Sequence, residues 1–164
     1  MNRTTTTAAT TAATTAVVAV TQLALVGLSV APQLSARATG ETYLLRVAAL
    51  DPVDPFRGAY VALDYPDLPR GGQVPDDGER GDVYVSLVPD GEVWVADGWS
   101  RERPGEGPYL ACDDGSWQLR CGIESWFLPQ DEAAAAEDLL RDGAVAEVRV
   151  DGRGHAAVVD VRGP

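Results

Sequence analysis

Lysine is absent from this chain of 164 residues, so every formally charged cationic side chain is an arginine. This absence excludes a Ser/Lys catalytic dyad. All 25 acidic residues lie at or beyond Glu41, with 11 of the 13 arginines, so residues 41–164 carry a formal charge of 11 − 25 = −14. No basic run occurs, and such a surface repels phosphates, so we expect no binding to nucleic acid.

Histidine is nearly absent as well, since His155 is the only one. A Ser-His-Asp site would have to use it, and a zinc site would need several ligands besides it. His155 adjoins glycines at a predicted hairpin tip, where a base is poorly positioned, so we expect an exposed loop residue. The acidic stretches 76–82 and 112–114 lack the EF-hand order and are explained as turns. No phosphate loop, HExxH or dinucleotide fingerprint occurs. We therefore expect no catalytic residue, no metal and no cofactor.

The N-terminal segment lacks charge between Arg3 and Arg37. An apolar run covers residues 16–31, and residues 12–31 just supply the roughly 20 mostly apolar residues that a spanning helix needs. Arg3 would hold the N-terminus in the cytoplasm and place the rest outside. We expect residues 1–38 to be a single-pass signal anchor with a linker, and residues 39–164 to be an extracytoplasmic domain. The alternative is a cleaved signal peptide and a secreted domain, because residues 36–38 read Ala-Arg-Ala.

Short alternating runs separated by turn signals predict a mainly β domain. We expect eight strands, at residues 42–50, 59–65, 82–88, 92–96, 108–112, 116–121, 144–150 and 155–161. Turn signals at residues 89–91, 113–115 and 151–154 predict three hairpins. One short helix begins after Asp131 as N-cap and ends before Gly143. The expected fold is an antiparallel β-barrel or sandwich with one short helix, preceded by the apolar N-terminal helix.

Residues 51–65, DPVDPFRGAYVALDY, form the most distinctive segment. The two Asp-Pro pairs favour extended corners, and Gly58 can supply a positive φ where the chain enters the next strand. Alternation then places Leu63 and Tyr65 on one face of that strand and Tyr60 on the other.

Two interpretations of this corner remain open. Asp54, Arg57 and Tyr60 could form a binding corner. Alternatively, the segment is a rigid β-corner in which Arg57 pairs with Asp54 or caps local carbonyl groups. Turn chemistry explains most of these residues and favours the second interpretation.

The spacing of Gly58, Tyr60, Leu63 and Tyr65 resembles the signature of the GDYXXLXY family of bacterial membrane-anchored proteins. Residues 121–130, CGIESWFLPQ, are similar to a second segment of that family. Two positions depart from its pattern, Ala59 in place of Asp and Gln130 in place of Glu. The loss of the Asp at Ala59 favours a structural role for the motif. The resemblance implies a membrane location and a partner such as a polytopic membrane protein, but it implies no activity.

Cys112 and Cys121 are the only cysteines and flank a predicted turn. In an extracytoplasmic domain such a pair is expected to form a disulfide. On the chain-entropy model, closing this short loop stabilises the fold by somewhat under about 3 kcal/mol. The spacing is not C-x-x-C, so a redox-active pair is not expected.

Glu124 lies between an apolar and an aromatic neighbour, and a buried Glu124 paired with Arg57 would bring the two family segments together. Our leading expectation is a non-enzymatic, membrane-tethered accessory or interaction domain beside an integral membrane partner. The alternative is a small-ligand-binding or hydrolytic domain with a pocket lined by Arg57, Tyr60, Tyr65 and Glu124. Convergence of these side chains in one pocket would favour the alternative, and their burial would favour the interaction domain.

Overall fold

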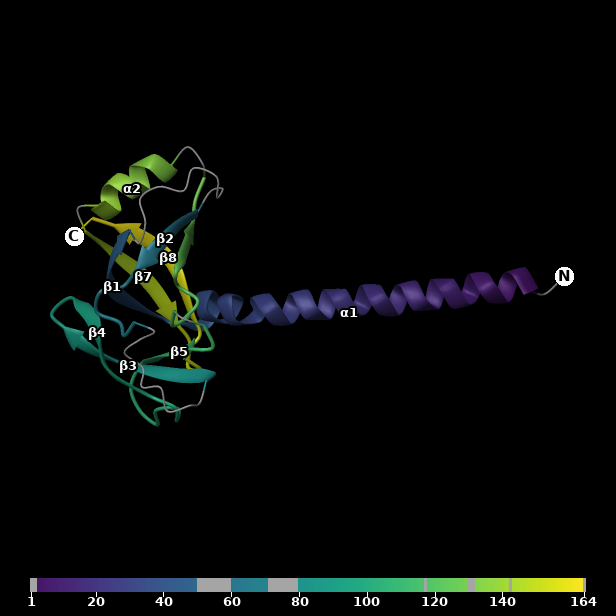
Figure 1. Cartoon of the computed structure of the whole chain (residues 1–164), viewed down its shortest axis with the longest axis horizontal. Coiled ribbons are helices and arrows are strands. Elements are labelled where there is room, and N and C mark those ends of the chain that lie inside the picture. Colours follow the sequence, from purple (N-terminus) through teal and green to yellow (C-terminus); the bar gives the residue numbers. More distant parts are fainter. Residues whose placement is uncertain are drawn as a thin grey trace.

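The computed structural model describes residues 3–49, 60–70, 80–116, 118–129, 132–141 and 143–163. A long helix, α1 (Arg3–Thr39), leads into a mainly β domain with eight antiparallel strands in its described part. Figure 1 shows α1 extending from one side of this domain like a rod, while the C-terminus lies on the opposite side.

The strands form two sheets. The larger sheet has the order β6-β2-β1-β7-β8, and the smaller sheet has the order β4-β3-β5. Their bounds are β1 (Glu41–Ala49), β2 (Tyr60–Asp64), β3 (Asp82–Asp90), β4 (Val93–Ser100), β5 (Tyr109–Asp113), β6 (Ser125–Phe127), β7 (Ala144–Val150) and β8 (Ala156–Arg162). The predicted mainly β, antiparallel fold is confirmed. The sheets are not closed into a barrel, because β6 and β8 remain as the two edges of the larger sheet.

The core lies between the two sheets and follows from strict alternation along the strands. In β7 and β3, every second residue is buried. The fully buried side chains from both sheets form one apolar cluster, which includes Leu45, Val47, Val83, Val85, Leu110 and Val148. Tyr43 of β1 and Trp94 of β4 add an edge-to-face pair with ring centroids 5.0 Å apart.

Two of the predicted hairpins are present, β3-β4 and β7-β8. The first has longer strands than expected, and its turn lies at Gly91 and Glu92 rather than at residues 89–91. Pro89 is part of β3 and pairs with Trp94. A proline is tolerated there because β5 pairs only with residues 82–86 of β3, so the missing N–H interrupts no ladder on that side.

The predicted strand at residues 116–121 is wrong. The described residues there make only one bridge to β5, between Asp113 and Arg120. Local polar bonds compete with a ladder, since the Asp113 carboxylate accepts from the Gly115 N–H at 2.9 Å. The eighth strand is instead β6, which is short and depends on pairing with the distant β2.

The short helix α2 (Ala133–Arg141) is present as predicted. Ala136 and Leu140 are buried, and the helix packs across the end of the larger sheet, near β1 and β2. Gly143 has the positive φ expected just after the helix, while the predicted N-cap Asp131 lies outside the described residues.

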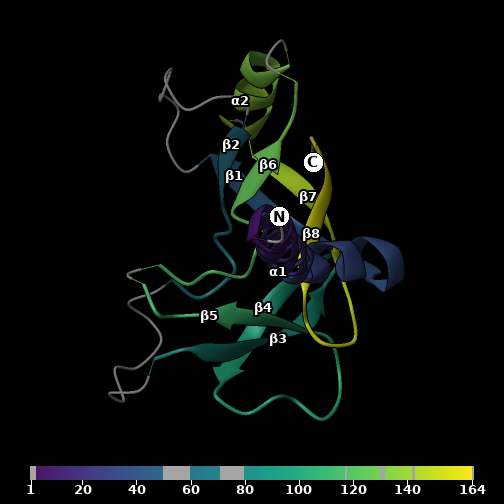
Figure 2. The ribbon, with the colours of Figure 1, turned by 90° about the vertical axis from the view of Figure 1, so that its right-hand side faces the viewer.

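Over residues 16–31, helix α1 exposes mostly apolar side chains, interrupted by Thr21, Gln22 and Ser29. The segment Thr15–Thr39 is long and apolar enough to cross a membrane, a property that a signal sequence near an N-terminus shares. The helix contains Pro32, which removes one backbone donor and causes kinks. Figure 2 looks along α1 from its N-terminal end and shows its last turns bending aside where they meet the domain.

Candidate functional site at the root of the N-terminal helix

The motif strand β2 supports the second family segment. The buried Tyr65 hydroxyl donates to the carbonyl oxygen of Ile123 at 2.9 Å, and the Leu63 N–H donates to the carbonyl oxygen of Glu124 at 2.9 Å. Both Leu63 and Tyr65 are buried. Burial raises the pKa of Tyr65 far above its ordinary value, and the nearby charge of Glu124 raises it further. The Tyr65 side chain and the Leu63 backbone thus hold the neighbouring segment in place, while both side chains are buried.

Three motif-segment residues of the predicted corner, Asp54, Arg57 and Gly58, lie outside the described residues. Tyr60 contributes its backbone, which pairs with Phe127 in the β2-β6 ladder. The two family segments therefore meet through strand pairing and through Tyr65. The predicted ion pair between Arg57 and Glu124 stays a prediction.

Glu124 is half-buried rather than buried, and backbone amides fix its carboxylate. Its Oε1 accepts from the N–H groups of Cys121 and Gly122, and Oε2 shares the Gly122 N–H at 3.1 Å. The carboxylate is thereby held against its own loop, with the unshared side of Oε2 still able to accept a hydrogen bond.

A disulfide between Cys112 and Cys121 joins this loop to the smaller sheet, with an S–S distance of 2.02 Å. Both cysteines are buried in the core cluster. The disulfide therefore fixes the position of the segment that carries Glu124 relative to β5.

A pocket of about 340 Å³ opens between this loop and the last turns of α1. It is lined by polar groups from the helix, by Glu124 and by side chains of the two edge strands of the larger sheet. The lining residues are Gln33, Arg37, Gly122, Glu124, Ser125, Trp126, Phe127, Val158 and Val159.

The last turns of α1 bridge the two edges of the larger sheet. The Gln33 side-chain amide donates to the carbonyl oxygen of Gly122 at 2.8 Å, on the β6 side. One N–H of Arg37 donates to the carbonyl oxygen of Val158 in β8 at 3.1 Å. The gap that keeps the sheet from closing is therefore spanned by the helix.

The junction of α1 with β1 is also fixed to β7. Arg149 donates to the carbonyl oxygen of Gly40 through Nε at 3.0 Å and Nη2 at 2.7 Å, and it also bonds the carbonyl oxygen of Arg37. Ala36 is completely buried. Gly40 packs so closely that a Cβ there would lie 2.4 Å from the carbonyl oxygen of Ala36.

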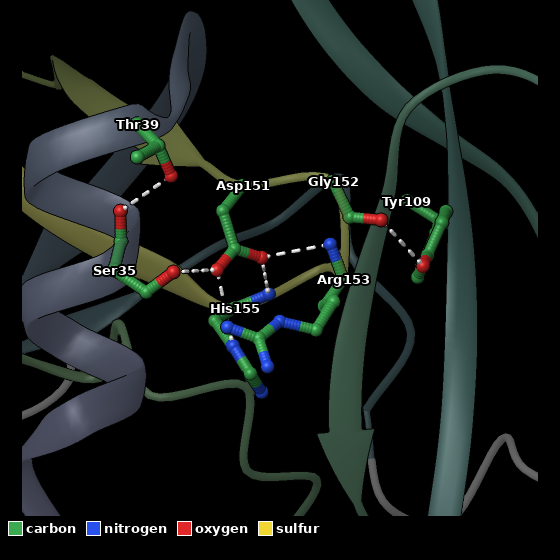
Figure 3. A network of polar contacts seen from close by, with 7 residues as sticks. All are labelled: Ser35, Thr39, Tyr109, Asp151, Gly152, Arg153 and His155. Carbon is green, nitrogen blue, oxygen red and sulfur yellow. Dashed lines mark hydrogen bonds and ion pairs between the residues drawn. The ribbon is translucent and has the colours of Figure 1, made fainter.

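Asp151 is the centre of the polar network shown in Figure 3. It lies in the loop between β7 and β8, and only 7% of its surface is exposed. Its Oδ2 accepts from the Ser35 hydroxyl at 2.5 Å and contacts the His155 Nδ1 at 3.1 Å. Its Oδ1 accepts from the N–H groups of Arg153 and His155 at 2.8 and 3.1 Å. One carboxylate thus ties helix α1 to the last hairpin.

The environment keeps Asp151 ionised. Burial alone would raise the pKa of this carboxyl, but the bonds from Ser35, Arg153 and His155 outweigh it and lower the pKa below its ordinary value. A buried charge of this kind is stable only while its hydrogen-bond partners stay in place.

Ser35, Asp151 and His155 meet here but do not form a nucleophilic triad. In such a triad the imidazole lies between the serine and the carboxylate and accepts the serine proton. Here the Ser35 hydroxyl donates directly to Asp151, and His155 contacts the same carboxylate. The arrangement lacks the serine-to-imidazole hydrogen bond of such a triad, and its contacts join α1 to the last hairpin.

The same loop reaches the smaller sheet. The Tyr109 hydroxyl donates to the carbonyl oxygen of Gly152 at 3.2 Å, and the Ala111 N–H donates to the carbonyl oxygen of Gly154 at 2.8 Å. The root of α1, the larger sheet and β5 therefore converge on residues 151–154.

Sequence reasoning missed most of this junction. Residues 151–154 were expected to be only a turn, and His155 an exposed loop residue, whereas its side chain is 31% exposed and contacts Asp151. An Asp that opens a hairpin loop is a signal for local amide bonds. Its bond to Ser35, which is 116 residues away, leaves no local signal.

Among the described residues, no group of three or more His, Cys, Asp and Glu side chains is placed to hold a metal ion. The acidic residues of the 76–79 stretch lie outside the described part of the chain.

Comparison with protein families gives one finding: the model described as GDYXXLXY protein matches residues 22–161. The match covers the second half of α1 and almost all of the β domain. Comparison with curated proteins gives no match, and neither does comparison with solved structures.

Proposed function

This chain belongs to the GDYXXLXY family, and we propose that it is a single-pass membrane protein whose β domain lies outside the cytoplasm. Residues 1–38 are the anchor with its root, and residues 39–164 form the domain. The domain acts as a non-enzymatic accessory or interaction module for an integral membrane partner, such as a polytopic membrane protein.

The observation that carries the proposal is the continuity of α1 from its apolar run into the fold. Apolar side chains point outward along its length, with Val17, Leu23 and Leu28 at 66%, 73% and 72% exposure. A helix that exposes mostly apolar side chains and carries no charge over about 20 residues is suited to a bilayer. Its last turns carry the polar contacts to Gly122, Val158 and Asp151, so the domain is held rigidly at the end of the helix.

The same contacts favour an uncleaved anchor over a signal peptide. A cut after Ala38 would remove the buried Ala36 together with Ser35 and Arg37, whose side chains bond Asp151 and Val158. Asp151 would lose the bond from Ser35, and Arg149 would lose the carbonyl oxygen of Arg37. The A-x-A sequence is helical, and its Ala36 is buried, whereas accessible loops are the usual sites of proteolysis.

Two further observations favour an extracytoplasmic interaction domain. The disulfide between Cys112 and Cys121 is typical of an oxidising compartment. The described motif side chains are buried and locally bonded, which disfavours a catalytic pocket built from them. The hydrolytic alternative is further weakened by the geometry of Ser35, Asp151 and His155.

The proposal is tested on native membranes. We expect the full chain to resist alkaline carbonate extraction and to have the intact mass of an uncleaved protein, and a mature start at Thr39 would contradict the anchor. In sealed right-side-out vesicles, an added protease should reach the β domain. Crosslinking in the membrane should then capture a specific integral membrane protein, and capture of none would contradict the interaction role.

A further inference from the structure

The pocket at the root of α1 lies where the proposed membrane begins. Gln33 and Arg37 follow the end of the apolar run at Ala31 by two and six residues. On a straight helix these positions would lie about 3 Å and 9 Å beyond the run. Pro32 lies at the start of this part of the helix, and Figure 2 shows the last turns of α1 bending aside where they meet the domain. The headgroup layer is about 5–7 Å thick on each side of the hydrocarbon core. With the proposed anchor in the membrane, Gln33 lies within the headgroup layer and Arg37 at its outer edge.

The lining of the pocket carries one cation and one anion. The Arg37 guanidinium has five N–H donors, and its contact with Val158 uses one of them. Glu124 presents a carboxylate whose Oε2 accepts only a shared N–H from Gly122. The helix and the loop therefore place opposite charges in the same pocket.

Apolar side chains complete the pocket. Trp126 is half-buried, while Phe127 and Val159 line it with exposures of 77% and 43%. Aromatic side chains are enriched at the level of the headgroups, where an apolar ring meets polar groups. A volume of about 340 Å³ suits a headgroup and not a whole lipid.

We propose that this pocket binds the headgroup of a zwitterionic phospholipid that carries a primary ammonium, namely phosphatidylethanolamine. The phosphate accepts hydrogen bonds from Arg37, and the ammonium donates to Glu124. The acyl chains lie beside α1, and Trp126 and Val159 contact the glycerol region. This inference rests on the proposed membrane anchor. An anionic lipid is disfavoured, because Glu124 and the net charge of −14 in residues 41–164 repel it.

Lipid titration of the full chain in detergent, followed by native mass spectrometry, tests the proposal. The probes are phosphatidylethanolamine and phosphatidylglycerol with identical acyl chains. We expect one phosphatidylethanolamine per chain, bound at least about tenfold more tightly than phosphatidylglycerol, as a charge-assisted bond at the headgroup implies. Equal binding of the two lipids, or binding of neither, would overturn the proposal.

Variants separate the pocket from general lipid contact with the helix. Glu124→Gln should abolish the preference for phosphatidylethanolamine. Arg37→Gln should lower the binding affinity for both lipids at least about tenfold. Val159→Trp fills the pocket without altering a described polar contact and should also block binding, which keeps the test valid if a charge variant fails to fold. Arg162→Gln is the matched control, because this arginine is the last residue of β8, does not line the pocket and should leave binding like that of the wild type. Unchanged binding in the three pocket variants would overturn the proposal.

Carbonate extraction of the same preparations distinguishes the two proposals. If the wild-type chain stays in the membrane but shows no selective binding, the pocket assignment fails and the anchor stands. If the wild-type chain is released from the membrane, the proposed function fails, and the lipid pocket fails with it.

Discussion

At the scale of single residues, the bond from Ser35 to Asp151 spans 116 residues, the largest sequence separation of any hydrogen bond to a carboxylate in the described part of the chain. Asp151 bonds α1 through Ser35, its own loop through Arg153, and the residue just before β8 through His155. Asp114 does comparable work in the smaller sheet, where the Arg101 guanidinium at 2.7 Å and the Gly81 N–H lower its pKa. Asp151 and Asp114 thus hold their loops in place through hydrogen bonds to ionised carboxylates.

Asp151→Asn removes the charge and keeps the shape, and we expect it to lower the free energy of unfolding by about 1–2 kcal/mol at neutral pH. The folded-state pKa of Asp151 lies below its ordinary value of 3.8, so the unfolded chain takes up the proton first as the pH falls. The stabilisation is therefore complete above that ordinary value and is lost as the pH drops through the folded-state pKa. Denaturant unfolding between pH 7 and pH 3 should show a weaker pH dependence in the variant. Asp160→Asn, at an exposed position of β8, is the control and should change neither quantity.

Tyr65 provides a second residue-scale prediction, because its hydroxyl is bonded in the core. Tyr65→Phe leaves the carbonyl oxygen of Ile123 without that donor, and we expect a loss of about 1–2 kcal/mol. The raised pKa adds a signature at high pH. Above pH 10 the unfolded chain ionises this tyrosine while the folded chain does not, so the wild type loses stability as the pH rises. Thermal unfolding from pH 8 to 11 should show that the stability of the variant decreases less steeply with pH than that of the wild type. Tyr109→Phe is the control, because the bond from Tyr109 to Gly152 is longer and only partly buried. An equal decrease in the free energy of unfolding in this variant would contradict the role given to the Tyr65 hydroxyl.

At the scale of elements, the attachment of α1 depends on how closely its end approaches β7. Gly40 allows that approach, since a Cβ would lie 2.9 Å from backbone atoms of Val150 as well as against Ala36. Both neighbours are main chain, so neither can move aside without displacing an element.

Gly40→Ala should therefore destabilise the fold by about 1–3 kcal/mol, as overpacking does elsewhere. The bonds from Arg149 to the junction should weaken as α1 shifts, which hydrogen exchange at residues 36–41 would detect as faster exchange. Gly98→Ala in β4 is the matched control, because a Cβ at that position meets nothing within 4 Å. Equal unfolding free energies for the two variants would show that the helix end is not tightly packed.

The elements also show what the sequence could predict. Local sequence patterns predict β3-β4, β7-β8 and α2, because turn residues and alternation are properties of neighbouring positions. Strand β6 was missed because three residues hold too little alternation, and its pairing with β2 joins positions about 65 apart in the chain. The expected strand at residues 116–121 failed because Asp113 and Asp114 bond local backbone groups.

At the scale of the whole molecule, the open edge of the larger sheet and the helix α1 form one unit. Gln33 bonds the loop before β6 and Arg37 bonds β8, so the helix occupies the gap between the two edges. The motif and the second family segment could be recognised in the sequence, and so could the apolar run. Their assembly around α1 could not, because each contact to Gly122, Val158 or Asp151 spans more than 85 residues of chain.

If α1 is part of the fold, its last turns should stabilise the domain without any membrane. A chain of residues 33–164 retains Gln33, Ser35 and Arg37, whereas a chain of residues 39–164 lacks all three. We expect the shorter chain to be less stable by about 2–4 kcal/mol in denaturant unfolding, since several hydrogen bonds and the burial of Ala36 are lost. Residues 33–164 with Ser35→Ala and Arg37→Ala serve as the control for length. The free energy of unfolding of this double variant should decrease toward that of the shorter chain. Equal stability of all three chains would instead favour a cleaved segment with no role in the mature domain, because a fold that loses nothing with residues 33–38 has not been built around them.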